Sequence, residues 1–247
     1  HHFLWATTTM EGRSTDSIAA ARRTAEHVHH GLIRDPQMAM LQHFASIPYY
    51  ALVRFGHWQE ILEEPAPEAD LLYPTAVWHY ARGVAYVRQG KLGNAQQELG
   101  EVRAIASNPA LQEVRIWGLN PASSLAQIAA SVLQGEIAAA KNKTNAAVAE
   151  LRRAIAIEDG LIYGEPPDWF YPARQNLGAI LLEAGRPRQA EEVYREDLAR
   201  FPDNGWSLFG LAQSLRAQGR KAEAADVQRR FETAWKYADV EITASRF

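Results

Sequence analysis

Small residues recur along this sequence at a constant spacing. Residues 171–204 and 205–238 align with a shift of 34 positions, and residues 76–109 align with both. Each copy has a small residue near its middle, a glycine seven positions later and an alanine five positions after that. These positions are Gly83, Gly90 and Ala95; Gly178, Gly185 and Ala190; and Ala212, Gly219 and Ala224. A repeat limits the choice of fold strongly, because every copy must form the same supersecondary unit.

The spacing within one copy predicts two helices joined by a tight turn. Leu177, Ile180 and Leu181 follow the three-and-four spacing of an amphipathic helix. The glycine that follows favours a left-handed C-terminal cap, which lets the chain reverse within a few residues. The small residues then fall where two helices cross, and Pro202 ends the unit. Each copy is therefore expected to be a helical hairpin. The small residue in the middle of its first helix is expected to face the alanine of its second helix.

This pattern resembles the tetratricopeptide repeat. The matching positions in residues 171–204 are Leu177-Gly178, Gly185, Ala190, Tyr194 and Pro202. Leu181 replaces the usual aromatic residue, and Asp197 replaces the last small residue. The resemblance implies an all-α fold, a right-handed α-solenoid of stacked hairpins.

Five to six hairpins account for most of the chain, with no β-strand expected. Weaker copies reverse at Gly12, Gly56 and Asn142, since asparagine also tolerates the left-handed conformation. Segments 108–121 and 159–170 interrupt the pattern. We expect one solenoid domain over residues 1–238, followed by a C-terminal tail, 239–247. The expected hairpins lie at about 1–30, 38–65, 76–109, 128–161, 171–204 and 205–238.

The segment 160–172 is an insertion with two adjacent prolines and several aromatic residues. Together with residues 78–83 and 193–198, it resembles a bacterial subgroup of tetratricopeptide proteins with no established activity. Two interpretations remain open. The aromatic residues form a rigid ligand pocket, or Trp169 and Phe170 fill the gap between the fourth and fifth hairpins, at 128–161 and 171–204, as large aromatic side chains commonly do.

The resemblance implies that the first helix of each hairpin lines a concave inner wall where partners bind. Aromatic residues and arginines at such positions suit the capture of a protein or peptide segment. The candidate partner-binding residues are Tyr50, Arg54, Tyr80, Arg88, Trp206, Phe209, Gln213 and Arg216; Glu136, Gln175 and Glu183 also fall at inner positions. The Lys and Asn pattern that clamps a C-terminal carboxylate in some family members is absent, which disfavours that ligand. We therefore predict a non-catalytic binding scaffold. The alternative is that these residues have no binding role, since any solenoid must expose some residues on its inner wall.

The competing hypothesis is a small-molecule or metal-binding protein, or an enzyme. Its pocket would comprise His79, Arg82, Tyr163, Glu165, Trp169, Tyr171 and Arg174. A packed, hydrogen-bonded histidine is the simpler interpretation of His79. The histidines at 27, 29 and 30 beside Glu26 supply too few converging ligands for a zinc site. No nucleotide-binding, zinc-protease or nucleophile-elbow motif is present, so we expect no catalysis, cofactor or metal.

Charge and composition limit the remaining partners. Lys plus Arg number 26 and Asp plus Glu 29, a net charge of −3, and the basic pairs are interleaved with Glu, which disfavours nucleic acid. No apolar run is long enough to insert into a membrane. The absence of cysteine excludes disulfides without assigning a compartment. The chain begins without Met or a leader pattern, so we expect a fragment or processed product. A cytoplasmic location is favoured, with secretion or a periplasmic location left open, and an unsealed first hairpin would favour homo-oligomers.

Overall fold

Six helical hairpins follow one another along the chain in a computed structural model that describes residues 1–247. The hairpins stack into an α-solenoid, which confirms the predicted fold class. They comprise α1 (His2–Met10) and α2 (Ser14–Glu26), α3 (Met40–Arg54) and α4 (Trp58–Glu63), α5 (Leu72–Arg88) and α6 (Leu92–Ala106), α8 (Ala122–Ala140) and α9 (Thr144–Asp159), α10 (Ala173–Glu183) and α11 (Pro187–Arg200), and α12 (Gly205–Ala217) and α13 (Lys221–Ala234).

Every hairpin reverses at a residue with positive φ. Five of the six turns use glycine, and the fourth uses Asn142, whose φ is 58°. Asparagine takes this conformation more readily than most residues because its short polar side chain can hydrogen-bond locally. The turn positions expected from the sequence are therefore confirmed, and they are Gly12, Gly56, Gly90, Asn142, Gly185 and Gly219.

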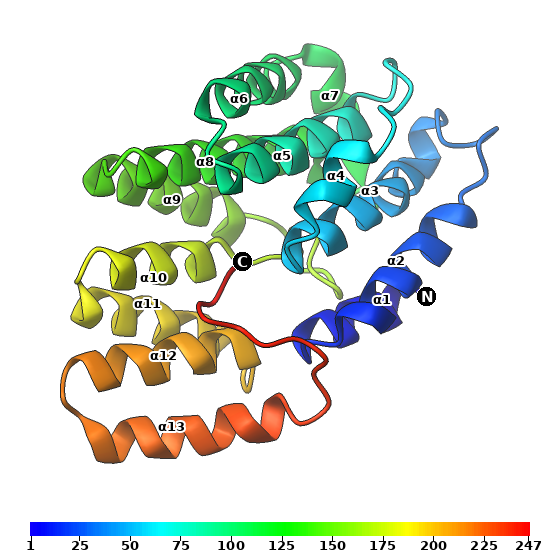
Figure 1. Cartoon of the computed structure of the whole chain (residues 1–247). Coiled ribbons are helices and arrows are strands. Elements are labelled where there is room, and N and C mark those ends of the chain that lie inside the picture. Colours follow the sequence, from blue (N-terminus) through cyan, green and yellow to red (C-terminus); the bar gives the residue numbers. More distant parts are fainter.

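The stack curves until its first and last hairpins meet. Figure 1 shows the blue N-terminal hairpin and the orange C-terminal hairpin approaching each other on one side of the molecule. Trp206 of α12 donates its indole N–H to the carbonyl of Thr9 in α1 (3.1 Å). The carboxylate of Asp239 accepts the backbone N–H groups of Ser14 and Thr15 (2.5 and 2.9 Å) and so caps α2. The first helices of the hairpins thus surround the interior of the solenoid, which we call the inner channel.

The mid-helix glycines make room for large neighbouring side chains. A Cβ on Gly178 would lie 2.4 Å from the ring of Tyr194 in α11, and a Cβ on Gly83 would lie 2.4 Å from Leu133 in α8. The atoms nearest to these two Cβ positions thus belong to large side chains, while Ala95, Ala190 and Ala224 are buried as the crossing positions require. A missing side chain on one helix leaves a hole, and close packing fills it with a large side chain from the next.

Substituting alanine at Gly178 should therefore destabilise the fold. The added methyl group meets a buried aromatic ring, and such overpacking costs about 1–3 kcal/mol. Gly100 in α6 is the matched control, because a Cβ there meets nothing within 4 Å. Gly100→Ala should stabilise the helix by about 0.5–1 kcal/mol. Urea unfolding of both variants checks this, and a shift of the same sign in both would contradict the packing.

Four short elements, the insertion and the tail lie outside the hairpins. A 3-10 helix covers Pro36–Met38, and α7 covers Pro109–Glu113. Two-residue strands, β1 (Arg115–Ile116) and β2 (Asn120–Pro121), pair antiparallel. The expectation of no strand was wrong here: positive φ angles at Trp117 and Gly118 reverse the chain, and strands this short have no alternating pattern to detect. The insertion, residues 160–172, and the tail, 239–247, have no regular secondary structure.

Candidate functional site

The inner channel is lined by the first helices of the hairpins and is filled by two segments of the same chain. The insertion enters between α9 and α10, and the tail turns back from α13. Figure 1 shows the red C-terminal segment running inward and ending among the inner helices. The candidate partner-binding residues must therefore be described together with these two segments.

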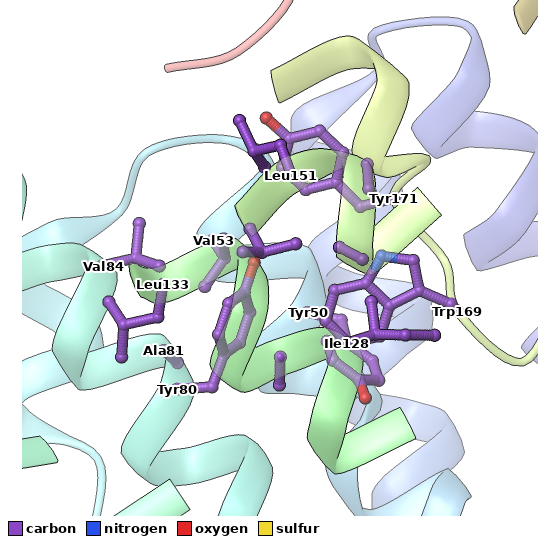
Figure 2. Close-up of a cluster of buried hydrophobic side chains, with 14 of the residues drawn as sticks. Tyr50, Val53, Tyr80, Ala81, Val84, Ile128, Leu133, Leu151, Trp169 and Tyr171 are labelled. Atoms are coloured by element: carbon purple, nitrogen blue, oxygen red, sulfur yellow. The ribbon is translucent and has the colours of Figure 1, made fainter. Parts of the chain in front are cut away.

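The insertion places aromatic side chains against the inner wall. Trp169 is only 2% exposed and lies edge-on to Tyr50 of α3 and Tyr80 of α5, with ring centroids 5.7 and 5.5 Å apart. Phe170 stacks on Tyr50 at 4.2 Å. Figure 2 shows this cluster, with Tyr171 and Leu151 nearby. Burial raises the pKa of both Tyr50 and Tyr80 well above the ordinary value. These two inner-wall tyrosines are thus covered by the chain itself.

Arg54 crosses the channel from α3. Its guanidinium lies 3.5 Å from the ring centroid of Trp206 and 4.3 Å from that of Tyr171, and its side chain donates to Gln175 Oε1 (2.6 Å). The residue is 2% exposed, and burial lowers its pKa to about 10. Cation–π contacts of this kind gain strength where water is excluded. The contact between Arg54 and Trp206 therefore connects α3 with α12.

Asp197 continues this buried polar network. Its Oδ2 accepts hydrogen bonds from Gln175 Nε2 (3.1 Å), Asn204 Nδ2 (3.0 Å) and the Ser207 hydroxyl (2.6 Å). Burial raises its pKa, while the bonds from Ser207 and Gln175 act in the opposite direction. The departure from a small residue at this repeat position was the sequence signal for the network, which joins α10, α11 and α12.

The last three residues of the tail make specific contacts with the channel wall. We call Ser245, Arg246 and Phe247 the clasp. The Ser245 hydroxyl donates to the carbonyl of Gln175 and shares a hydrogen bond with the Tyr194 hydroxyl, both at 2.7 Å. The repeat pattern assigned the tail no contact, because the pattern ends before the tail begins.

Charged side chains hold the rest of the clasp. Arg246 forms ion pairs with Glu136 of α8 (3.1 Å) and Glu183 of α10 (2.8 Å). Arg88 of α5 pairs with the same Glu136 (2.9 Å) and donates its Nε–H to the carbonyl of Phe247 (2.7 Å). Three first helices therefore contribute to one charged site inside the channel.

Glu136 is the centre of this charged site. It is 1% exposed, and Asn176 Nδ2 donates to its other carboxylate oxygen (2.8 Å). Burial by itself raises the pKa of a carboxyl group, but the charges of Arg246 and Arg88 and the Asn176 bond outweigh burial and leave the pKa of Glu136 below its usual value. Glu136 is thus an ionised carboxylate that attracts a guanidinium.

The other candidate inner-wall residues lie on the open side of α12. Phe209 is half-buried, with its ring centroid 5.3 Å from that of Phe231 in α13. Gln213 is half-buried, and the exposed Arg216 donates to Gln228 of α13 (2.6 Å). These three side chains remain accessible at the end of the solenoid.

The residues of the alternative pocket fall into separate places. His79 and Arg82 both bond to Glu98 of α6, at 2.5 and 2.9 Å. Arg174 pairs with Asp159 at the end of α9 (2.7 Å). No hydrogen bond or ion pair links His79 or Arg82 to the insertion.

Within the insertion itself, the candidate residues also divide. Tyr163 is exposed and bonds to Glu165, whereas Trp169 and Tyr171 point into the core. An apolar cleft of about 170 Å³ lies between α1 and the insertion, with Glu165 at its edge. The geometry therefore assembles no shared polar pocket from the two segments.

No group of three or more His, Asp and Glu side chains comes together in an arrangement that could hold a metal ion. In the histidine cluster, His27 Nδ1 bonds to the carbonyl of Arg23 (2.6 Å), while His29 and His30 are exposed.

Glu158 of α9 gives the fold a distinct pH dependence. Burial raises its pKa to about 7, although the N–H of Ala173 donates to it (2.9 Å). The folded chain then binds this proton more tightly than the unfolded chain, whose carboxyl pKa is about 4. The contribution of this proton to the free energy of unfolding is fully present below about pH 4. It is lost as the pH rises through about 7.

Glu158→Gln should remove that loss. The amide oxygen still accepts from Ala173, and no charge is buried at high pH, so the variant should be more stable than the wild type by about 1–3 kcal/mol at pH 8. At pH 4 the two chains should differ little. Urea unfolding at both pH values measures this, with Glu101→Gln on the exposed face of α6 as the control. A gain that is equal at both pH values would contradict the assignment.

Comparison with known families gives a match in the C-terminal half of the chain. Residues 181–227, which run from the end of α10 through α11 and α12 into the first half of α13, match the tetratricopeptide repeat family. The comparison with curated proteins returned no significant match. None of the helices is long and apolar enough to span a membrane.

Proposed function

We propose that this tetratricopeptide repeat protein is a non-catalytic scaffold that binds a segment of a partner protein along its inner channel. Tetratricopeptide repeats commonly serve as scaffolds for protein interactions. The proposal adds the place, the channel between α5, α8, α10 and α12, and the form of the ligand, a non-helical peptide.

The observation that carries the proposal is the clasp. A non-helical segment already lies in the channel, held through its main chain at Phe247 and through its side chains at Ser245 and Arg246. Main-chain contacts supply affinity and side-chain contacts supply selectivity in peptide recognition. The wall therefore has the chemistry that binding an extended peptide requires.

The candidate residues take different roles in this proposal. Arg88 contacts the bound segment directly, and Trp206 lies beside Phe247 with ring centroids 5.9 Å apart. Tyr50, Tyr80 and Arg54 support the wall from beneath, because the insertion covers them. Phe209 and Arg216 contact α13, and no hydrogen bond joins Phe209, Gln213 or Arg216 to the clasp, so the proposal gives these three predicted binding residues no direct role.

Site-specific photo-crosslinking tests the proposal. A benzophenone amino acid at Glu183, which faces the clasp, should crosslink to peptides that this same variant selects from a displayed random library. The same group at Ala199, on the exposed face of α11, is the matched control and should capture none. Equal crosslinking at both positions, or selected peptides that crosslink at neither, would overturn the proposal.

A further inference from the structure

The clasp contacts define the kind of peptide that the channel accepts, and this inference rests on the proposed function. Arg246 is 7% exposed in its side chain, and its Nη2 donates to both carboxylate oxygens of Glu183 (2.8 and 2.9 Å), while Nη1 lies 3.1 Å from Glu136. The planar guanidinium presents several N–H donors in a fixed fork. A site with carboxylates from two different helices therefore fits arginine better than lysine.

The neighbouring position selects a small hydroxyl side chain. Ser245 is fully buried, and its hydroxyl bridges the Tyr194 hydroxyl and the carbonyl of Gln175. An alanine here would leave the buried Tyr194 hydroxyl without its partner, and a buried polar group left unpaired is costly. A larger side chain would have no space at a position with no exposed surface.

The position after the arginine selects an aromatic residue. The Phe247 ring lies 5.9 Å from that of Trp206, in an edge-on arrangement. Its side chain also packs on the backbone of Gly56, where an added Cβ would lie 3.0 Å from it. Arg88 donates to a main-chain oxygen at this position, so that contact does not select the side chain.

The segment that joins the clasp to the fold is held weakly. Asp239 is fixed at the start of α2, but residues 241–244 make no hydrogen bond to the wall, and Glu241 and Thr243 are exposed. Hydrogen bonds therefore hold this segment only at its two ends, at Asp239 and at the clasp.

We infer that the channel binds partner segments with the sequence small hydroxyl residue, arginine, aromatic residue, and that the chain's own Ser245-Arg246-Phe247 occupies this site as a competing internal ligand. The apparent affinity for a partner is then lowered by the fraction of molecules whose clasp is closed. Weakening the clasp should therefore strengthen the binding of a partner segment, because the wall residues are unchanged and less often occupied.

Fluorescence anisotropy with a labelled, C-terminally amidated peptide of sequence 240–247 tests this on the full chain. The Arg246→Ala chain should bind the peptide with a dissociation constant at least tenfold lower than the wild type does. We call this variant the released chain, because its clasp is weakened. Ser245→Ala also weakens the clasp and replaces Arg246→Ala if that variant folds poorly. Arg195→Ala, which removes an arginine from the exposed face of α11, is the matched control and should behave as the wild type.

The peptide variants test the selectivity. On the released chain, alanine or lysine in place of the peptide's arginine should raise the dissociation constant at least tenfold, and alanine at the position of Thr243 should leave it unchanged. Equal binding of all these peptides would overturn the inference, while library peptides that crosslink at Glu183 would still support the scaffold. If the released chain binds no peptide of any sequence, both the inference and the proposed function fail.

Discussion

Replacing Trp169 with alanine is expected to lower the free energy of unfolding by about 3–5 kcal/mol. The indole is 2% exposed and lies between Tyr50 and Tyr80, which come from different helices. Its removal leaves a large cavity, and the surrounding helices cannot close it without separating from their other neighbours. The loss should appear as a lower urea midpoint with an unchanged denaturant slope.

Tyr163 provides the control for this prediction, because it belongs to the same insertion but is 78% exposed. Tyr163→Ala should change stability by no more than about 0.5 kcal/mol. If Trp169→Ala had an equally small effect, the insertion would be an open pocket and would not fill the channel. The structure places the tryptophan in the core as a filling side chain, but against α3 and α5 and not at the seam between the hairpins at 128–161 and 171–204 where the gap-filling interpretation expected it.

Replacing Glu136 with alanine is expected to destabilise the fold by a similar amount, about 3–5 kcal/mol. The change leaves Arg88 without its carboxylate partner and removes one of the two carboxylates that hold Arg246. Asn176 also loses its acceptor. Breaking a buried ion pair from one side costs this much because the remaining charge stays desolvated.

A double-mutant cycle measures how much of this destabilisation comes from the ion pair between Glu136 and Arg246 of the clasp. Glu136→Ala combined with Arg246→Ala should cost less than the two single changes added together, because the second change removes one of the stranded charges. Glu101→Ala, an exposed carboxylate of α6, is the control and should be nearly silent. Strict additivity in urea unfolding would show that the two residues do not interact.

The hairpins were predictable because their signals are local. A turn residue with positive φ and small residues at fixed offsets are steric requirements within about 34 residues, so they leave a trace in the sequence. Asn142 is an instructive case, since the conformational reason for asparagine identifies the fourth turn even though the consensus glycine is missing.

What fills the channel was not predictable, because those contacts join distant parts of the chain. Arg54 and Gln175 lie 121 positions apart, and Ser245 and Gln175 lie 70 apart. The repeat register indicates which side chains face inward, but it does not say whether solvent, a partner or the chain itself covers them. For that reason Tyr50 and Tyr80 were identified as inner-wall residues while their burial under Trp169 was not foreseen.

The residence of the clasp in the channel can be measured directly by the distance between two spin labels. The chain has no cysteine, so labels on Thr243→Cys and Ala199→Cys attach at those two sites alone. Pulsed electron resonance should give one narrow distance distribution for the free chain and a broad, shifted one once the amidated clasp peptide has bound. A distribution that stays narrow and unmoved in the presence of bound peptide would contradict the account.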